Sequence, residues 1–357
     1  MDRPRLLEDI LAQPTSLSRV LSHHSGDGLG ALLEAARVIR GARNVIVAGM
    51  GASLHACIPL QYQLAQEGMQ VVVVEAAELL HYQRQICRGS VVLLVSRSGE
   101  SVEIVKLLPH IKTLASCTIG VTNEPTSTLG IGSDLLLTIG CLQDEMIAIQ
   151  SYTATVLVLM LLASAIARDL SGTREALQRI LGSMPSLIAA SLASLQEWDG
   201  FFKTESLAPI YLLGRGPSYA SCLEGALLFN ETAKAPATGM AAGSFRHGPV
   251  EIVDSDFRGL IFAPQGATAD INRALARDLV RFGGEVRVIG PCGGTDPTLR
   301  IIEVPATHEM FAPLLEIIPV QLAALRRAQL RGLRVGKFRH TQQVARDEAT
   351  FSPGPPR

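Results

Sequence analysis

Short runs of consecutive apolar residues alternate with helical patterns in the first half of the chain. The runs lie at 45–48, 71–74, 91–95 and 118–121. Between them, residues 53–67 and 101–114 carry apolar residues at helical spacing. Continuous apolar runs of this length are typical of strands that are buried on both faces. The alternation predicts a parallel sheet whose strands are joined by right-handed crossovers and covered by helices on both faces.

The second half of the chain repeats this pattern. Apolar runs at 210–213 and 259–262 and the largely apolar segment 286–289, which contains Arg287, predict strands, and the segments 218–233, 268–282 and 309–331 have the spacing of helices. The turns match as well, because the glycine turn at 48–53 follows the first strand as the turn at 213–218 follows the first strand of the second half. The sequence therefore predicts one α/β architecture that is used twice.

We expect a first domain at 25–170, a second domain at 195–335 and an irregular C-terminal tail at 336–357. A polar helical stretch at about 170–205 connects the two domains. Residues 146–167 contain no charged side chain and are long enough to span a bilayer. Polar residues in the first half of this segment leave only a short continuous apolar run, so we interpret it as a helix buried inside a domain.

The composition is that of a packed globular protein. Hydrophobic residues make up 47% and charged residues 18% of the 357 residues, which excludes a disordered chain. The formal net charge is −1, so no global field attracts nucleic acid or an anionic membrane, and we expect neither as a partner. A small anionic substrate would have to be held by local donors in loops.

The six cysteines are widely spread and form neither a CxxC pair nor a spaced set with histidine. This spacing predicts no metal site and favours reduced thiols in a cytoplasmic protein. The N-terminus lacks the apolar core of a signal peptide, which agrees with that location.

The clearest chemical signal is the segment 96–101, here called the serine loop, between the strand 91–95 and a helix. Three hydroxyls, a glycine and the free N–H groups of a helix N-terminus form a site for a phosphate at the carboxyl end of a parallel strand. Arg97 can add a charge-assisted fork. The turn after the first strand aims a further hydroxyl at the same edge. The candidate phosphate-binding residues are Gly51, Ala52, Ser53, Ser96, Arg97, Ser98 and Ser101.

Two other interpretations remain open for these motifs. Ser101, with Glu103 close behind it, could be an ordinary helix N-cap. The turn of Gly49 and Gly51 could bind a dinucleotide, although Leu54 stands where a third glycine is expected. No acid suited to clamp a ribose follows the second strand before residue 75. We therefore expect no dinucleotide cofactor.

Taken together, the motifs resemble a known family. The chain is similar to the double SIS (sugar isomerase) domain proteins, in particular the isomerase half of the glutamine–fructose-6-phosphate aminotransferases and the SIS-type glucosamine-6-phosphate deaminases. The resemblance rests on the turn 49–56, the serine loop, the stretches 212–216 and 223–231 and the segment 241–249, which occur in the family's order between about 30 and 345. It implies two SIS domains, each a flavodoxin-like, three-layer α/β/α fold.

The resemblance also implies roles for single residues. The serine loop and Ser53 would hold the 6-phosphate of a sugar. Glu231 falls on the family's catalytic glutamate, which moves a proton between C1 and C2, and Glu224 falls on a second acid. His247 falls on the histidine that opens the sugar ring, which the partner subunit of a homodimer usually supplies. A carboxylate in a dry pocket and a histidine suit these two steps, although each residue could instead have a structural role.

Two departures from the family bear on the reaction. Gln343 stands at the position of the lysine that forms an imine with the open-chain ketose, and Leu228 replaces a helix lysine near the catalytic glutamate. Lys234 and Lys337 are the candidates to replace these amines. No glutaminase segment precedes the first strand, so we do not expect synthesis of glucosamine 6-phosphate from glutamine.

The resemblance and the residues together imply a cofactor-free isomerase or deaminase of a hexosamine or hexose 6-phosphate. The leading activity is the conversion of glucosamine 6-phosphate to fructose 6-phosphate and ammonia. A fructosamine-6-phosphate deglycase and a plain aldose–ketose isomerase are alternatives within this chemistry. A regulatory module that binds a sugar phosphate without turnover is the alternative from another class.

Overall fold

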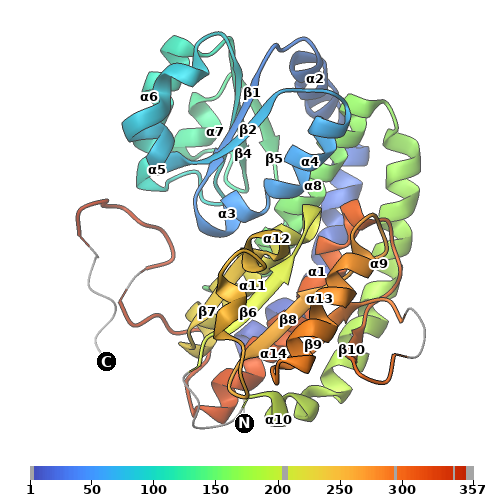
Figure 1. Cartoon of the computed structure of the whole chain (residues 1–357). Helices are drawn as coiled ribbons and strands as arrows, with labels where there is room; N and C mark the ends of the chain where they lie inside the picture. Colours follow the sequence, from blue (N-terminus) through green and yellow to red (C-terminus); the bar gives the residue numbers. More distant parts are fainter. Residues whose placement is uncertain (1–3, 203–207, 293–295, 341, 351–357) are drawn as a thin grey trace. The chain divides into compact units, whose positions relative to one another are not determined.

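Each half of the chain forms one five-stranded parallel sheet, as the apolar runs predict (Figure 1). The computed structural model describes residues 4–202, 208–292, 296–340 and 342–350. The strand orders are β2-β1-β3-β4-β5 in the first sheet and β10-β9-β8-β6-β7 in the second. When the strands of each sheet are numbered from 1 to 5 along the chain, and the second sheet is read from its other edge, both sheets have the strand order 2-1-3-4-5. This is the order of flavodoxin-like folds. The predicted duplicated α/β fold is confirmed.

The strands are short and parallel throughout. Those of the first sheet are β1 (Val45–Gly49), β2 (Val71–Glu75), β3 (Val91–Val95), β4 (Cys117–Thr122) and β5 (Leu135–Thr138). Those of the second are β6 (Ile210–Gly214), β7 (Ala237–Ala241), β8 (Arg258–Phe262), β9 (Glu285–Gly290) and β10 (Arg300–Glu303). The apolar runs did not predict β5, β7 and β10. All three are edge strands with mixed or partly exposed residues, so they lack the continuous apolar run of a central strand.

Helices connect the strands and flank both sheets. In the first half of the chain they are α1 (Arg5–Ser25), α2 (Leu29–Arg40), α3 (Gly51–His55), α4 (Ile58–Gln66), α5 (Ala76–Glu78), α6 (Val102–Leu114), α7 (Thr128–Gly132), α8 (Gln150–Ala167) and α9 (Leu170–Ala193). In the second half they are α10 (Trp198–Phe201), α11 (Tyr219–Leu228), α12 (Ala242–Phe245), α13 (Ala269–Arg281) and α14 (Pro313–Leu330). The predicted helix 53–67 is interrupted between α3 and α4, and the predicted helix 218–233 continues beyond α11 as a π-helical turn, Phe229–Ala233.

The chain divides into two compact units, which are described separately. The first unit contains Thr15–Gln178 together with the segment that starts at Phe338. The second contains Arg179–Lys337 together with the segment that ends at Pro14. The described residues from Phe338 onward form no helix or strand. This C-terminal tail therefore belongs to the first unit, although the second unit precedes it in sequence.

The charge-free segment of the first unit forms α8, the helix at its centre. Among the described residues, α8 is the one helix long and apolar enough to cross a membrane, and 94% of its 18 residues are buried. It packs against α2 and α4, and a helix that is apolar on all sides is expected in such a position. Its burial agrees with a core helix.

One carboxylate holds the N-terminus of α8. Asp144 is buried and accepts hydrogen bonds from the backbone N–H groups of Ile149 (3.2 Å), Gln150 (2.8 Å) and Ser151 (3.0 Å). The Ser151 hydroxyl donates to the same carboxylate at 2.5 Å. The orphan N–H groups of a buried helix end are thereby satisfied by one side chain.

We predict that Asp144→Ala lowers the free energy of unfolding by about 3 kcal/mol, because buried donors lose a charged acceptor. Urea unfolding of the full chain measures this loss. Asp27→Ala, which removes an exposed carboxylate from the same unit, is the control and should change stability by less than about 0.5 kcal/mol. If the two variants unfolded at the same urea concentration, the role of Asp144 in capping α8 would be contradicted.

Candidate functional site

The serine loop lies between β3 and α6 and is organised by its own hydroxyls. The Oγ atoms of Ser96 and Ser101 are 3.2 Å apart, and the Gly99 N–H donates to Ser96 Oγ at 3.2 Å. The Glu100 N–H donates to Ser98 Oγ at 3.2 Å. Ser101 occupies the N-cap position of α6, but its hydroxyl makes no capping hydrogen bond. An ordinary N-cap therefore does not explain this serine.

Neighbouring elements fix the shape of the serine loop. The Arg97 carbonyl accepts a hydrogen bond from Thr122 Oγ1 (3.0 Å) at the end of β4. The Glu100 carboxylate accepts hydrogen bonds from the N–H (2.5 Å) and the hydroxyl (3.0 Å) of Thr128, the first residue of α7. A carboxylate at a helix N-terminus is electrostatically favourable. Glu100 is thus tied to α7, while the hydroxyls and Arg97 lie on the loop beside it.

Gly99 is required by space as well as by conformation. Its φ angle is +65°, in the left-handed region that favours glycine. A Cβ atom at this position would stand 1.9 Å from Ser127 Oγ and 2.6 Å from Ser127 Cβ. The serine loop therefore packs its backbone directly against the start of α7.

The turn after β1 lies at the same edge of the sheet as the serine loop. In the register of the two neighbouring strands, Gly49 of β1 pairs with Val95 of β3. The two segments that follow, the turn with Ser53 and the serine loop, therefore leave the sheet at one level. Gly51 has a φ angle of +50° and begins α3. The strand register thus groups the predicted phosphate-binding residues at one edge.

The C-terminal tail contributes to this edge, which the motifs did not predict. The Val102 N–H at the start of α6 donates to the carbonyl of Ala345 (3.0 Å). Glu348 binds His81 at 3.0 Å and forms an ion pair with Lys106. A cavity of about 400 Å³ is lined by residues 344–348 of the tail together with Met50, Glu75 and Glu103, among others. A tail of low apolar content carries no periodic signal, so only the structure reveals this contact.

Gln343 fixes the tail to the loop before α8. Its amide nitrogen lies 3.4, 3.1 and 3.3 Å from the carbonyl oxygens of Asp144, Glu145 and Met146. At the position where the resembling family has an imine-forming lysine, this chain thus has an amide engaged with backbone carbonyls.

In the second unit, two of the predicted catalytic residues lie on one helical segment. Glu224 is on α11 and is buried, with 1% of its surface exposed. Glu231 lies seven residues later in the π-helical turn, a feature that is frequent at functional sites. Burial raises the pKa of Glu231 to about 7, the Glu224 carboxylate adds to the increase, and Lys234 opposes it. Glu231 can therefore exchange a proton near neutral pH.

Lys234 ends this segment in a left-handed conformation, with φ +50°. Its ammonium group donates a hydrogen bond to the carbonyl of Glu231, and its own carbonyl accepts one from Arg331 Nη1 at 2.6 Å. The lysine considered as a replacement amine is thus engaged at the C-terminus of its own helix, where a cation is favourable.

His247 lies in the turn after α12, and its side chain is exposed in the second unit. The backbone N–H of His247 donates to the backbone carbonyl of Ser244 (3.0 Å). The phosphate-binding candidates belong to the first unit, and Glu224, Glu231 and His247 belong to the second. The candidates therefore fall into two sets, one in each unit.

A further buried acid, Glu316 of α14, was missed by the motif analysis. Its carboxylate accepts hydrogen bonds from the hydroxyls of Ser218 (3.0 Å) and Ser221 (2.6 Å). Burial raises the pKa of Glu316 to about 7, and the two hydroxyls oppose the increase. The signal that could have identified it is a lone acid within an apolar helix.

Among the residues that the structure describes, no group of three or more histidine, cysteine, aspartate or glutamate side chains is placed so that it could hold a metal ion. All six cysteines are free thiols. The side chains of the two sets offer hydroxyls, one guanidinium, carboxylates and an imidazole.

Comparison with known proteins gives consistent matches over most of the chain. The profile of the SIS domain family matches residues 38–165 and 208–328. The glutamine–fructose-6-phosphate aminotransferase (isomerizing) of Zymomonas mobilis is 28% identical over 348 residues, which cover 93% of this chain and 57% of that protein. The human glutamine–fructose-6-phosphate aminotransferase (isomerizing) 2 is 30% identical over 317 residues, which cover 85% of this chain and 46% of that protein. The chain thus spans about half the length of these curated relatives.

Two solved structures share the fold. The C-terminal domain of glucosamine-fructose-6-phosphate aminotransferase from Francisella tularensis has a TM-score of 0.81 at 20% identity, with 93% of this chain and 97% of that chain covered. Glucosamine-6-phosphate deaminase from Thermotoga maritima has a TM-score of 0.77 at 20% identity, with 96% and 99% covered.

We predict that Gly99→Ala weakens the binding of inorganic phosphate at least tenfold, because the added methyl group forces the serine loop away from Ser127. Isothermal titration calorimetry measures the affinity. Gly89→Ala is the matched control, since Gly89 also has a positive φ angle (+69°) but has no atom within 4 Å of the added Cβ. Similar affinities of the two variants would show that the packing of Gly99 has no part in anion binding.

Proposed function

Because the chain belongs to the SIS domain family, we propose that it is a sugar-phosphate isomerase or deaminase acting on a hexosamine or hexose 6-phosphate. The leading activity is the conversion of glucosamine 6-phosphate and water to fructose 6-phosphate and ammonia. The observation that carries the proposal is the partly buried Glu231 in the π-helical turn, whose pKa is raised to about 7 by desolvation and by the buried acid Glu224. An acid–base group is most effective when its pKa is close to the working pH.

The serine loop supports a phosphorylated substrate. Its hydroxyls and Arg97, with the hydroxyl of Ser53 at the same sheet edge, offer donors to the three oxygens of a phosphate monoester. The tail carbonyl of Ala345 already occupies the Val102 N–H, so the anion would depend on side chains and the remaining loop N–H groups. The 6-phosphate is the part of the substrate assigned to this set.

Glu231 is the proposed proton carrier. In the open-chain aldose, its carboxylate removes the proton from C2 and returns it to C1, while O1 gains a proton and the amino nitrogen loses one, so that C1 becomes a CH₂OH group and C2 becomes an imine. Water then adds to the imine carbon, and ammonia leaves to give the ketose. With a hydroxyl at C2, the same proton transfer yields the ketose directly, without loss of ammonia. The proton transfer needs no redox partner.

We further propose a homodimer in which His247 completes the site of the partner subunit and assists ring opening. Its exposure in the second unit supports this role, because an imidazole used by a neighbouring subunit must be accessible. Six free cysteines support the expected cytoplasmic location.

We predict that Glu231→Gln reduces turnover by about 10²–10⁴-fold while sugar-phosphate binding persists, because the amide keeps the shape and removes the base. The base is the ionised carboxylate, so kcat of the parent should rise as the pH increases through about 7. A panel of hexose, hexosamine and fructosamine 6-phosphates in deuterated water tests the proposal. Ammonia release, ketose formation and hydrogen exchange at C1 and C2 are followed together.

Glu197→Gln, which changes a glutamate elsewhere in the second unit, is the control and should retain turnover and exchange. Exchange at the parent rate in Glu231→Gln would remove this residue from the mechanism. A parent protein that binds a sugar phosphate but exchanges no hydrogen would instead identify a regulatory module.

A site that is shared between the two subunits of a homodimer leads to a separate prediction. Mixing a His247→Ala chain with a Glu231→Gln chain should restore activity, because mixed dimers contain one site with both residues intact. Up to about one quarter of the parent activity is expected from random pairing, since half the dimers are mixed and each has one intact site. Tagged chains report subunit exchange, and exchange without recovery would show that each subunit supplies its own histidine.

A further inference from the structure

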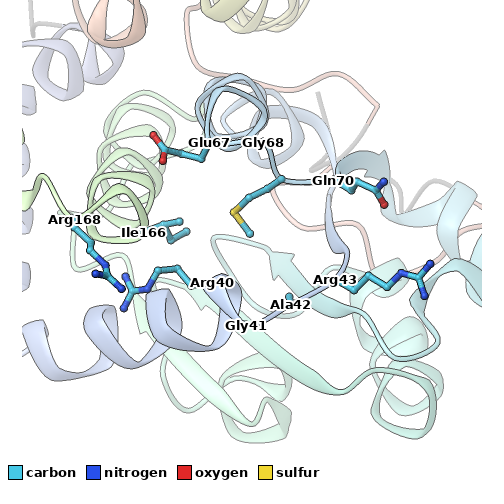
Figure 2. Close-up of a pocket in the computed structure, with 10 residues that line it drawn as sticks. Arg40, Gly41, Ala42, Arg43, Glu67, Gly68, Gln70, Ile166 and Arg168 are labelled. Atoms are coloured by element: carbon cyan, nitrogen blue, oxygen red, sulfur yellow. The ribbon is translucent and has the colours of Figure 1, made fainter.

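The first unit has an open hollow at the end of the sheet opposite to the serine loop. It has a volume of about 690 Å³ and is lined by residues 40–43 before β1, residues 67–70 before β2, and Ile166 and Arg168 at the end of α8 (Figure 2). This size lies within the range of small-molecule sites. The segments that form it enter the strands, whereas the serine loop and the turn with Ser53 leave them.

The hollow carries an excess of positive charge. Arg40, Arg43 and Arg168 line it together with a single carboxylate, that of Glu67. In Figure 2, the guanidinium groups of Arg40 and Arg168 lie near each other and that of Arg43 lies on the other side. Arg40 Nη1 donates to the carbonyl of Ala165 at 2.7 Å. Within the described part of the chain, the side chains of Arg43 and Arg168 form no hydrogen bond or ion pair, and the backbone N–H of Arg168 donates to the carbonyl of Ser164.

The duplicated fold provides an internal comparison. The corresponding place in the second unit lies before β6, before β7 and near the end of α14, and is lined by Phe202, Pro236 and Arg327, among others. Only about 10 Å³ remains there. The ring of Phe202 is buried, and the guanidinium of Arg327 lies 5.5 Å from its centroid. The fold can therefore close this space with an aromatic ring and an arginine.

The hollow of the first unit is lined by arginines but by no aromatic ring such as that of Phe202. Met69 and Ile166 supply an apolar lining, and glycines at 41 and 68 leave room beside them. Because the repeat fills the same place with a planar group under a guanidinium, an external planar group would complete the first unit in the same way. Its phosphate groups would then neutralise arginines that have no carboxylate partner.

We propose that this hollow binds a phosphorylated molecule that carries a planar or apolar group, at a site separate from the serine loop. The guanidinium groups hold the phosphates, and the planar group packs against Met69 and Ile166. Arg43 lies on one side of the hollow, and Arg40 and Arg168 lie on the other. Two linked phosphates can reach both sides, so they fit this arrangement better than a single phosphate does. The proposal does not depend on the proposed catalytic activity.

Calorimetry of the full chain with ADP, adenosine and pyrophosphate tests the proposal. The double variant Arg97→Ala/Ser98→Ala serves as the parent, so that phosphate binding at the serine loop does not contribute. We expect ADP to bind at least tenfold more tightly than either of its parts. Added Arg43→Gln or Arg168→Asn should each weaken ADP binding about tenfold, which corresponds to about 1.4 kcal/mol. Asparagine suits position 168, where φ is +62°.

Arg37→Gln is the matched control, because Arg37 is an exposed arginine of α2 that pairs with Glu34 and does not line the hollow. It should leave ADP affinity unchanged. Absence of ADP binding at millimolar concentration would overturn the site, as would affinity unaffected by both arginine substitutions. Equal binding of ADP and pyrophosphate would overturn the role of the planar group. Circular dichroism confirms that the exposed substitutions leave the fold intact.

Discussion

The parallel pairing of β1 with β3 is the constraint on which the candidate phosphate site depends. Gly49 stands opposite Val95, so two segments distant in sequence leave the sheet at one level. Both strands are buried on both faces, so a slip of one residue would move each side chain to the opposite face and disrupt the close packing there, which disfavours another register. The hydroxyls of the two segments are therefore positioned by the burial of the strands behind them.

The two halves of the chain use the same turn for different purposes. In the first unit, the turn after β1 carries Ser53 at the same sheet edge as the serine loop. In the second, the turn after β6 carries Ser218, whose hydroxyl is bound by the buried Glu316. A buried hydroxyl engaged with a carboxylate holds α14 against the turn. In the second unit the hydroxyl of this turn is therefore engaged with an interior carboxylate.

The sequence predicted the central strands and the duplicated α/β fold, because buried parallel strands and strand-to-helix turns have strong local signals, and it suggested two sets of candidate residues that stay a prediction. The edge strands β5, β7 and β10 escaped prediction because their residues are not continuously apolar. Glu316 escaped because its partners, Ser218 and Ser221, are about a hundred residues away. The place of the tail on the first unit could not be deduced, since polar contacts such as those of Glu348 leave no periodic pattern.

The attachment of Gln343 has a mechanical consequence. An amide nitrogen has two hydrogens, yet three successive carbonyl oxygens lie within 3.1–3.4 Å of it. No single acceptor defines the bond, so the amide can exchange one carbonyl for the next while at least one hydrogen bond persists. The attachment of the tail is therefore shared among three acceptors, and the loss of any one of them leaves the amide tied to the loop before α8.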